Sequence, residues 1–237
     1  MHNKNLYINF AIQSTFNLKN MENHQDHLKN LTEIRSLMEK SSRFISLSGL
    51  SGIFAGIFAL AGAAAIFIRF DYHFIQRYIE GGVYSYSRML HKSDLLDFIV
   101  FAFIDAVVVL TLAVGSAVFF TIRKSKKKGQ SIWDKAGLRM LVNLAIPLAT
   151  GGIFCLILIW HGIIYLVGPA TLIFYGLSLL NAGKYTLNDV RYLGICEIVL
   201  GLVATVFTGY SLFFWAVGFG VLHIVYGAVM YFKYETR

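Results

Sequence analysis

The sequence predicts an all-α fold, an integral membrane bundle of six transmembrane helices with both termini in the cytoplasm. Of the 237 residues, 57% are hydrophobic and only 14% are charged, whereas soluble domains carry about a quarter charged residues. Apolar runs of about 20 residues, the length that crosses a bilayer as a helix, recur along the chain. The basic residues lie between these runs, so a membrane surface explains the net charge of +8 better than nucleic acid does.

Six apolar runs in the sequence are long enough to cross a membrane. They cover residues 44–68, 95–122, 138–160, 163–180, 187–208 and 211–231. Pro169 falls inside the fourth run, and a helix that began there would be too short to span the bilayer. We therefore expect a full-length fourth helix with a kink at Pro169. Together these runs form one transmembrane domain, residues 44–237.

Residues 1–43 are expected to form a cytoplasmic N-terminal segment that contains a short amphipathic helix. The apolar side of that helix consists of Leu31, Ile34, Leu37 and Met38. Such a helix would lie on the membrane surface, although a plain extension of the first transmembrane helix fits the pattern equally well. Residues 1–20 read either as a weakly ordered extension or as a stretch ahead of a natural start at Met21.

The distribution of lysine and arginine predicts the orientation of the bundle. If the N-terminus is inside, 17 of these residues lie on the cytoplasmic side and 4 on the outer side. Positively charged residues are enriched in cytoplasmic loops. An even number of spans then places both termini in the cytoplasm.

Four ionisable side chains lie within the predicted spans, where each costs about 2.5–3.5 kcal/mol on insertion scales and so needs a partner or a function. They are Asp97, Asp105, Glu197 and His223. Asp97 lies near a helix N-terminus, where the helix dipole favours an anion. Asp105 lies about ten residues into its helix and is a candidate buried acid.

Glu197 and His223 form a candidate intramembrane polar pair. Each lies 13 positions from the turn near residue 210, so an antiparallel hairpin places the two at one depth. Each also has glycines three residues before and four residues after it, on the same helix face. Because glycines let membrane helices approach closely, we expect the two residues to share a hydrogen bond or ion pair across a tight seam. A structural role in holding helices together is favoured over a proton or substrate role.

The first span carries a further face of small residues, Ser48, Gly52 and Gly56, spaced every four positions. This spacing is typical of close packing between membrane helices. Its partner is either another span of this chain or another subunit.

No recognised catalytic or cofactor motif occurs in the sequence. It has no HExxH, no zinc-spaced cysteine and histidine set, no Walker loop and no GxSxG. We therefore expect no catalytic residues, no cofactor and no metal, and hence no enzyme. The leading interpretation is a non-enzymatic scaffold, accessory subunit or sensor. The alternative is a small proton-coupled transporter that uses Asp105, Glu197 and His223.

Several stretches resemble an uncharacterised family of small polytopic bacterial membrane proteins. They are LTEIRSLMEKSSRFISLSGLSGIFAGIFAL, NLAIPLATGGIFCLILIW, GPATLIFYGLSLLNAGKYTLNDVRYLG and FWAVGFGVLHIVYG. The resemblance covers most of residues 31–235 and implies a multi-pass protein of the bacterial cytoplasmic (inner) membrane. It brings no activity. The expected partners are the lipid bilayer and either a second copy of the chain or another membrane protein, but not nucleic acid.

Overall fold

The computed structural model describes Leu31, Ile34 and residues 48–70, 92–127 and 135–236. The chain divides into two compact units, Met1–Ser42 and Arg43–Arg237. Leu31 and Ile34 belong to the first unit, and both are helical and exposed. The rest of the predicted amphipathic helix, with Leu37 and Met38, lies outside the described residues. The long helices that the structure describes belong to the second unit.

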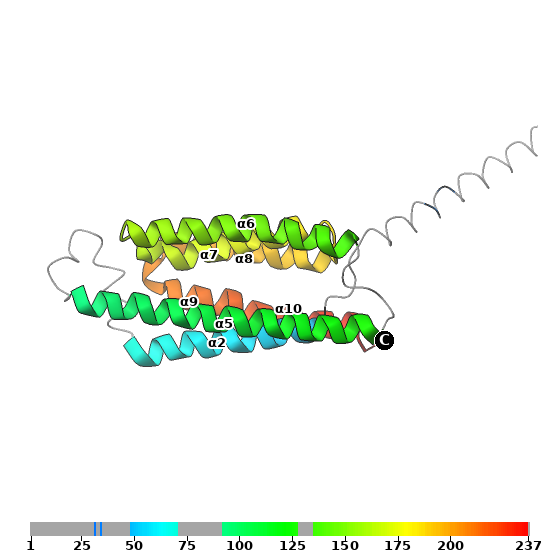
Figure 1. The fold of residues 1–237 in the computed structure, drawn as a ribbon, viewed down its shortest axis with the longest axis horizontal. Coiled ribbons are helices and arrows are strands. Elements are labelled where there is room, and N and C mark those ends of the chain that lie inside the picture. Colours follow the sequence, from blue (N-terminus) through cyan, green and yellow to red (C-terminus); the bar gives the residue numbers. More distant parts are fainter. Residues whose placement is uncertain (1–30, 32–33, 35–47, 71–91, 128–134, 237) are drawn as a thin grey trace, which may run out of the picture. The chain divides into compact units, whose positions relative to one another are not determined.

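Six long helical segments make up the described part of the second unit, which is all-α as predicted (Figure 1). Each segment covers most of one of the six predicted runs, and residues 44–47 of the first run lie outside the described residues. The segments are α2 (Gly49–Phe70), α5 (Lys92–Lys127), α6 (Lys135–Trp160), η1 (Ile164–Leu166) with α7 (Val167–Ala182), α8 (Asn188–Val206), and a last segment of η2 (Thr208–Tyr210), α9 (Ser211–Trp215), η3 (Ala216–Leu222) and α10 (His223–Tyr234).

Five of these segments are long and apolar enough to cross a membrane, namely α2, α5, α6, η1 with α7, and the segment from η2 to α10. They leave large apolar side chains exposed, such as Ile104, Ile146 and Ile153, more than half of whose surface is uncovered. Such surfaces require lipid around them. The remaining predicted span, the fifth at residues 187–208, corresponds to α8, which differs because Asp189, Arg191 and Glu197 fall within its 19 residues.

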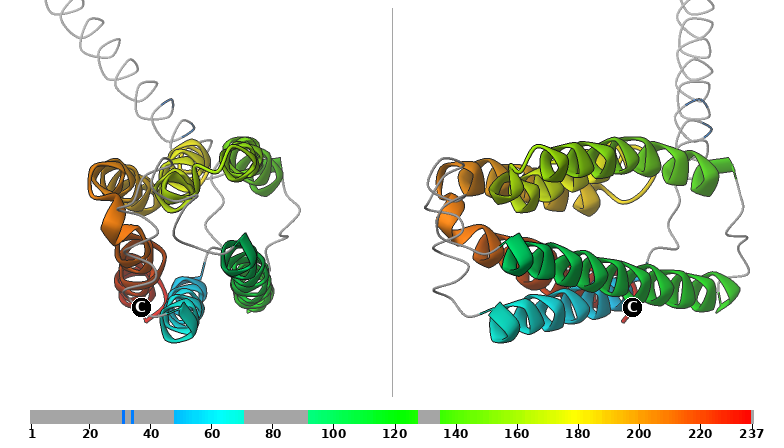
Figure 2. Two further views of the ribbon diagram at one scale, coloured as in Figure 1. Left: turned by 90° about the vertical axis from the view of Figure 1, so that its left-hand side faces the viewer. Right: turned by 60° about the vertical axis from the view of Figure 1, so that its left-hand side comes forward.

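The helices of this unit lie in two rows. In one row α2 packs between α5 and α10, and in the other α7 packs between α6 and α8 (Figure 2). The last segment joins the rows, because α9 contacts α7 and α8 while η3 and α10 contact α8. The rows are therefore held together mainly along the edge where α8 meets the last segment.

The chain order of the two rows reveals a symmetry that the sequence did not indicate. Helices α2, α5 and α6 form one triplet, and α7, α8 and the last segment form a second. In the first triplet, α2 packs against α5 and against the last segment, which belongs to the second triplet. In the same way, α7 of the second triplet packs against α8 and against α6, which belongs to the first. Because three successive antiparallel helices reverse the chain direction, the two triplets run in opposite senses. Triplets of opposite sense are the plan on which inverted-repeat membrane proteins are built.

Close backbone contact between glycines joins α2 to α10. A methyl group placed on Gly227 would lie 2.5 Å from the backbone nitrogen of Ile53 and 2.6 Å from the carbonyl oxygen of Gly49. Gly56 approaches Gly220 in the same way, because a methyl group on Gly56 would lie 2.5 Å from the carbonyl oxygen of Gly220. The small-residue face of the first span thus packs against the last helix of the same chain.

A second glycine contact joins α7 to α8 and corrects the predicted seam. A methyl group on Gly176 would lie 2.6 Å from the carbonyl oxygen of Gly194, and one on Gly201 would lie 2.7 Å from the Ile173 side chain. The expectation that the glycines around Glu197 face those around His223 is therefore wrong. The glycines of α8 face α7, whereas Gly220 of η3 and Gly227 of α10 face α2. Spacing places glycines on one helix face but does not specify which neighbour that face meets.

The fourth segment accommodates Pro169 at the start of its α-helix and not at a kink within it. The fourth segment opens with the 3-10 turn η1, and the α-helix begins at Val167. Pro169 is then in the first helical turn, where its missing N–H would have no intrahelical partner anyway. Together η1 and α7 comprise 19 residues, enough to cross the bilayer core.

Replacing Gly227 with alanine tests the contact between α2 and α10. The added methyl group meets backbone atoms that cannot move aside, so we expect Gly227→Ala to lower the free energy of unfolding by about 1–3 kcal/mol. The measurement is the midpoint of thermal unfolding in detergent. Gly115→Ala is the matched control, because a methyl group there meets nothing within 4 Å. Equal midpoints for the two variants would contradict the packing.

Candidate functional site

Glu197 and His223 lie close together between the two rows of helices. Glu197 is near the middle of α8 and His223 is the first residue of α10. The distance from His223 Nδ1 to Glu197 Oε1 is 3.4 Å. Both are buried, with 0% of Glu197 and 6% of His223 exposed. The structure thus brings this predicted pair together, although the neighbouring glycines serve other contacts.

Both ring nitrogens of His223 have hydrogen-bond partners other than Glu197. Nδ1 lies 3.0 Å from the carbonyl oxygen of Gly218, and Nε2 lies 2.8 Å from the hydroxyl of Tyr175 on α7. A carbonyl oxygen can only accept, so Nδ1 carries the proton and donates it to Gly218. In the neutral ring Nε2 then accepts from the Tyr175 hydroxyl. A neutral imidazole is fully satisfied by these two bonds.

Glu197, in contrast, is buried without a hydrogen bond. Neither carboxyl oxygen has a hydrogen-bond partner among the described residues, since Nδ1 of His223, 3.4 Å from Oε1, donates to Gly218 instead. The carboxyl group lies against the backbone of Gly218, where a methyl group would be 2.5 Å from Oε2. Gly218 belongs to η3, a π-helical stretch, and such stretches are frequent at functional sites. A polar group buried in this way lowers stability, so a purely structural role explains Glu197 poorly.

Asp105 of α5 lines a cavity between the two rows. The cavity has a volume of about 200 Å³. Its wall is mostly apolar and comes from α2, α5, η1, α7 and α9; it consists of Ile66, Phe98, Ala102, Asp105, Ala106, Ile164, Tyr165, Val167, Gly168, Thr171, Ser211, Leu212 and Trp215. Neither Glu197 nor His223 belongs to this wall. The structure therefore does not bring Asp105 together with the other two predicted residues.

The side chain of Asp105 rests on a glycine of the neighbouring helix. A methyl group on Gly62 of α2 would lie 2.8 Å from Asp105 Oδ2. Within the described part of the chain no hydrogen bond or ion pair involves this carboxylate. Two turns away, Asp97 differs, because Arg69 pairs with it at 3.0 Å. More than half of each of these two side chains is exposed.

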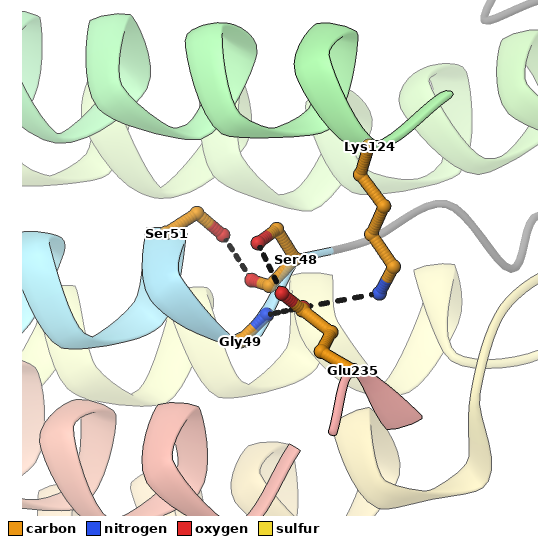
Figure 3. A network of polar contacts seen from close by, with 5 residues as sticks. All are labelled: Ser48, Gly49, Ser51, Lys124 and Glu235. Carbon is orange, nitrogen blue, oxygen red and sulfur yellow. Dashed lines mark hydrogen bonds and ion pairs between the residues drawn. The ribbon is translucent and has the colours of Figure 1, made fainter. Parts of the chain in front are cut away.

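At the opposite end of the same row, Glu235 joins three helices (Figure 3). Its Oε1 accepts from the backbone N–H of Gly49 at 2.6 Å and lies 3.1 Å from Lys124 Nζ. Its Oε2 accepts from the hydroxyl of Ser48 at 3.4 Å. A carboxylate at the N-terminus of α2 complements the helix dipole there. We call this the Glu235 end of the bundle, and the end with Arg69 and Asp97 the Asp97 end.

A second polar cluster at the Glu235 end connects the two rows. Asp189 of α8 accepts from Lys233 Nζ at 3.0 Å and from the hydroxyl of Tyr234 at 2.7 Å, both at the end of α10. The cavity, in contrast, lies toward the Asp97 end, because its wall includes the last residues of α2 and the first of α7 and α9. Polar groups thus bridge the rows at the Glu235 end, whereas at the Asp97 end the cavity lies beside the contacts of α9 with α7 and α8.

Sequence reasoning missed several of these groups. Tyr175 gives no signal in the sequence, since a tyrosine in an apolar run is usual. The acidic residues Asp189 and Glu235 lie at helix ends, where charged residues need no special explanation. The cavity depends on how the rows meet, which one-dimensional spacing does not encode.

Comparisons with protein-family models, with curated proteins and with solved structures found no match for this chain. The resemblance to a family of small polytopic bacterial membrane proteins therefore stays a prediction.

Two buried tyrosines allow a matched test of the His223 interaction. Tyr175→Phe removes the donor to Nε2 and leaves a buried ring nitrogen unsatisfied, which costs about 1–3 kcal/mol. We expect a lower midpoint of thermal unfolding in detergent. Tyr226→Phe removes a buried hydroxyl that has no partner in the described residues, so its midpoint should be unchanged or higher. A similar loss in both variants would rule out the assigned bond.

Glu197 provides a test of whether the polar pair stabilises the fold. Because the carboxyl group has no hydrogen bond, replacing it with an apolar side chain of similar size removes a cost and leaves no partner unsatisfied. We therefore expect Glu197→Leu to unfold at the wild-type temperature or above it, as Glu197→Gln should. A midpoint well below wild type for the leucine variant alone would indicate that the pair holds the helices together.

Proposed function

We propose that this polytopic membrane protein is a non-enzymatic carrier of a small solute, coupled to protons. One observation supports this most strongly: an ionisable side chain, Asp105, lines a cavity between the two rows of helices, to which two triplets of opposite sense both contribute. Ionisable residues inside a membrane typically mark solute, ion or proton pathways. Inverted repeats with a site near their interface are characteristic of secondary transporters.

The proposed topology has six spans, with α8 as the fifth and both termini in the cytoplasm of a bacterium. Its support is that α8 packs along α7 from Arg191, beside Gly183, to Gly201, beside Ile173. Lipid-facing residues of α8 such as Ile195, Val199 and Leu202 are exposed and apolar. With basic residues inside, the Glu235 end faces the cytoplasm and the Asp97 end faces outward. The cavity then lies in the outer half of the membrane.

The conformation corresponds to the outward-facing state of such a carrier. At the cytoplasmic end the rows are bridged by Asp189 with Lys233 and Tyr234. Transport would require these contacts to open while the outer cavity closes. The glycine contacts within each row keep the row rigid, so that rocking of one row against the other is the simplest motion.

Glu197 is the proposed proton site of the carrier. Aromatic contacts connect it indirectly to the cavity wall. Trp215 of the wall lies 5.0 Å from the ring of Phe219, and Phe219 stacks on His223 at 6.0 Å. All three residues belong to the last segment, so a movement of the wall at Trp215 would displace the imidazole beside Glu197. Protonation of a buried carboxyl group would then be linked to occupancy of the cavity.

A scaffold, accessory subunit or sensor is the second candidate. The dry environment of Glu197 and His223 favours it, because neither residue lines the cavity that Asp105 lines. In that case the exposed apolar faces of α5 and α6 would bind another membrane protein or a second copy of the chain.

Cysteine accessibility distinguishes these candidates without knowledge of the solute. Cys155 and Cys196, which form no disulfide, are first replaced with alanine. Ala102→Cys then places a thiol in the cavity wall, and Ile104→Cys places one on the exposed apolar surface at nearly the same depth. A carrier alternates between outward- and inward-open states. We therefore expect the thiol at position 102 to react with a membrane-impermeant methanethiosulfonate in both right-side-out and inside-out vesicles.

The thiol at position 104 is the control and should react in neither preparation, because lipid excludes the reagent. Reaction at position 102 from the outer side alone would refute the carrier while leaving an outward-open binding cavity. Absence of reaction from either side would favour the scaffold.

A further inference from the structure

We propose that the cavity binds a small organic cation with an apolar body about the size of one aromatic ring, and that Asp105 is its counter-ion. The proposal rests on the carrier function for its biological meaning, since such a cation would be the transported solute. The binding itself follows from three properties of the wall: its size, its charge and its aromatic side chains.

The size and surface of the cavity limit the ligand to a small, mostly apolar molecule. The volume is about 200 Å³, and apolar cavities of about 150 Å³ accommodate benzene. A ring with a short chain therefore fits. Phe98 of α5, Tyr165 of η1 and Trp215 of α9 contribute aromatic rings to the wall. Aromatic faces attract cations as well as apolar groups.

The charge of the wall selects a cation. Asp105 is the one acidic residue among the described wall residues, and none of them is lysine, arginine or histidine. Among the described side chains, Arg69 is a cation near this end of α5, and it already pairs with Asp97. The wall includes the start of α7 at Val167 and Gly168, whose helix dipole offers only a partial positive charge. A ligand with a full positive charge would complete the site.

Asp105 is held in place by its packing. Gly62 lies behind the carboxylate, and a methyl group there would approach Oδ2 to 2.8 Å and the Val109 side chain to 2.6 Å. The absence of a side chain at position 62 thus makes room for the acid next to α2. On the cavity side, the hydroxyls of Thr171 and Ser211 are further polar groups of the wall. An ammonium group has three donors, which an acid and nearby hydroxyls can accept.

Binding of phenethylamine to the purified full-length protein in detergent tests the proposal. The amine is protonated near neutrality, and phenethyl alcohol is its neutral analogue of nearly equal size. Equilibrium dialysis with the radiolabelled compounds measures both affinities. We expect wild-type protein to bind the amine at least about tenfold more tightly than the alcohol, which corresponds to one charge-assisted interaction.

Two aspartate variants locate the counter-ion. Asp105→Asn should weaken amine binding by about tenfold or more and leave alcohol binding unchanged. Asp97→Asn, which removes an exposed acid from the same helix, should bind the amine as wild type does. Loss of amine binding in the Asp97 variant, or its retention in the Asp105 variant, would overturn the assignment.

The comparison of the two compounds on wild-type protein keeps the proposal testable even if Asp105→Asn fails to fold. Equal affinity for amine and alcohol, or no binding of either, would refute it. Binding is separable from transport. If the cavity prefers the amine but the thiol at position 102 reacts from one side only, this inference is upheld and the carrier is refuted. If the thiol reacts from both sides but the cavity does not prefer the amine, the carrier is upheld and this inference is refuted.

Discussion

Close approach of helix backbones at glycines is the constraint on which this structure depends. In lipid there is no hydrophobic force that drives helices together, so association relies on van der Waals contact and on the few polar groups available. Gly49 and Gly227 bring α2 against α10, and Gly176 and Gly194 bring α7 against α8, at distances that no side chain would allow. Each row is therefore firmly packed, whereas the rows meet mainly along one edge.

The described polar groups of the interior are of two kinds, those with hydrogen bonds and those without. His223 is satisfied by Tyr175 and by the Gly218 carbonyl, and such bonds strengthen the contact between rows. Glu197 and Asp105 lack hydrogen bonds among the described residues. Groups that lower stability in a medium of low dielectric are retained where they serve a purpose. Tightly packed rows, a cavity between them and two acids without hydrogen bonds in the described part of the chain are the features from which the proposed carrier function is argued.

Residue patterns predicted much of this arrangement. The features that they did not predict all depend on which helix faces which. The six helices and their limits followed from the length of apolar runs, and the common depth of Glu197 and His223 followed from counting to the turn near residue 210. The seam proposed between their glycines was wrong, because periodicity identifies a face and not its neighbour. Tyr175, the cavity wall and the role of Glu235 were missed for the same reason.

Local chemistry along the chain was enough to determine a helical protein suited to lipid, since each helix closes its own backbone hydrogen bonds and its apolar length sets whether it can span. It also marked Asp105, Glu197 and His223 as residues whose burial needs an explanation. Only the tertiary structure decided which helices became neighbours and which acid lined a cavity. Those outcomes depend on contacts between segments far apart in the chain, and several alternative pairings of the same faces satisfy the local rules equally well.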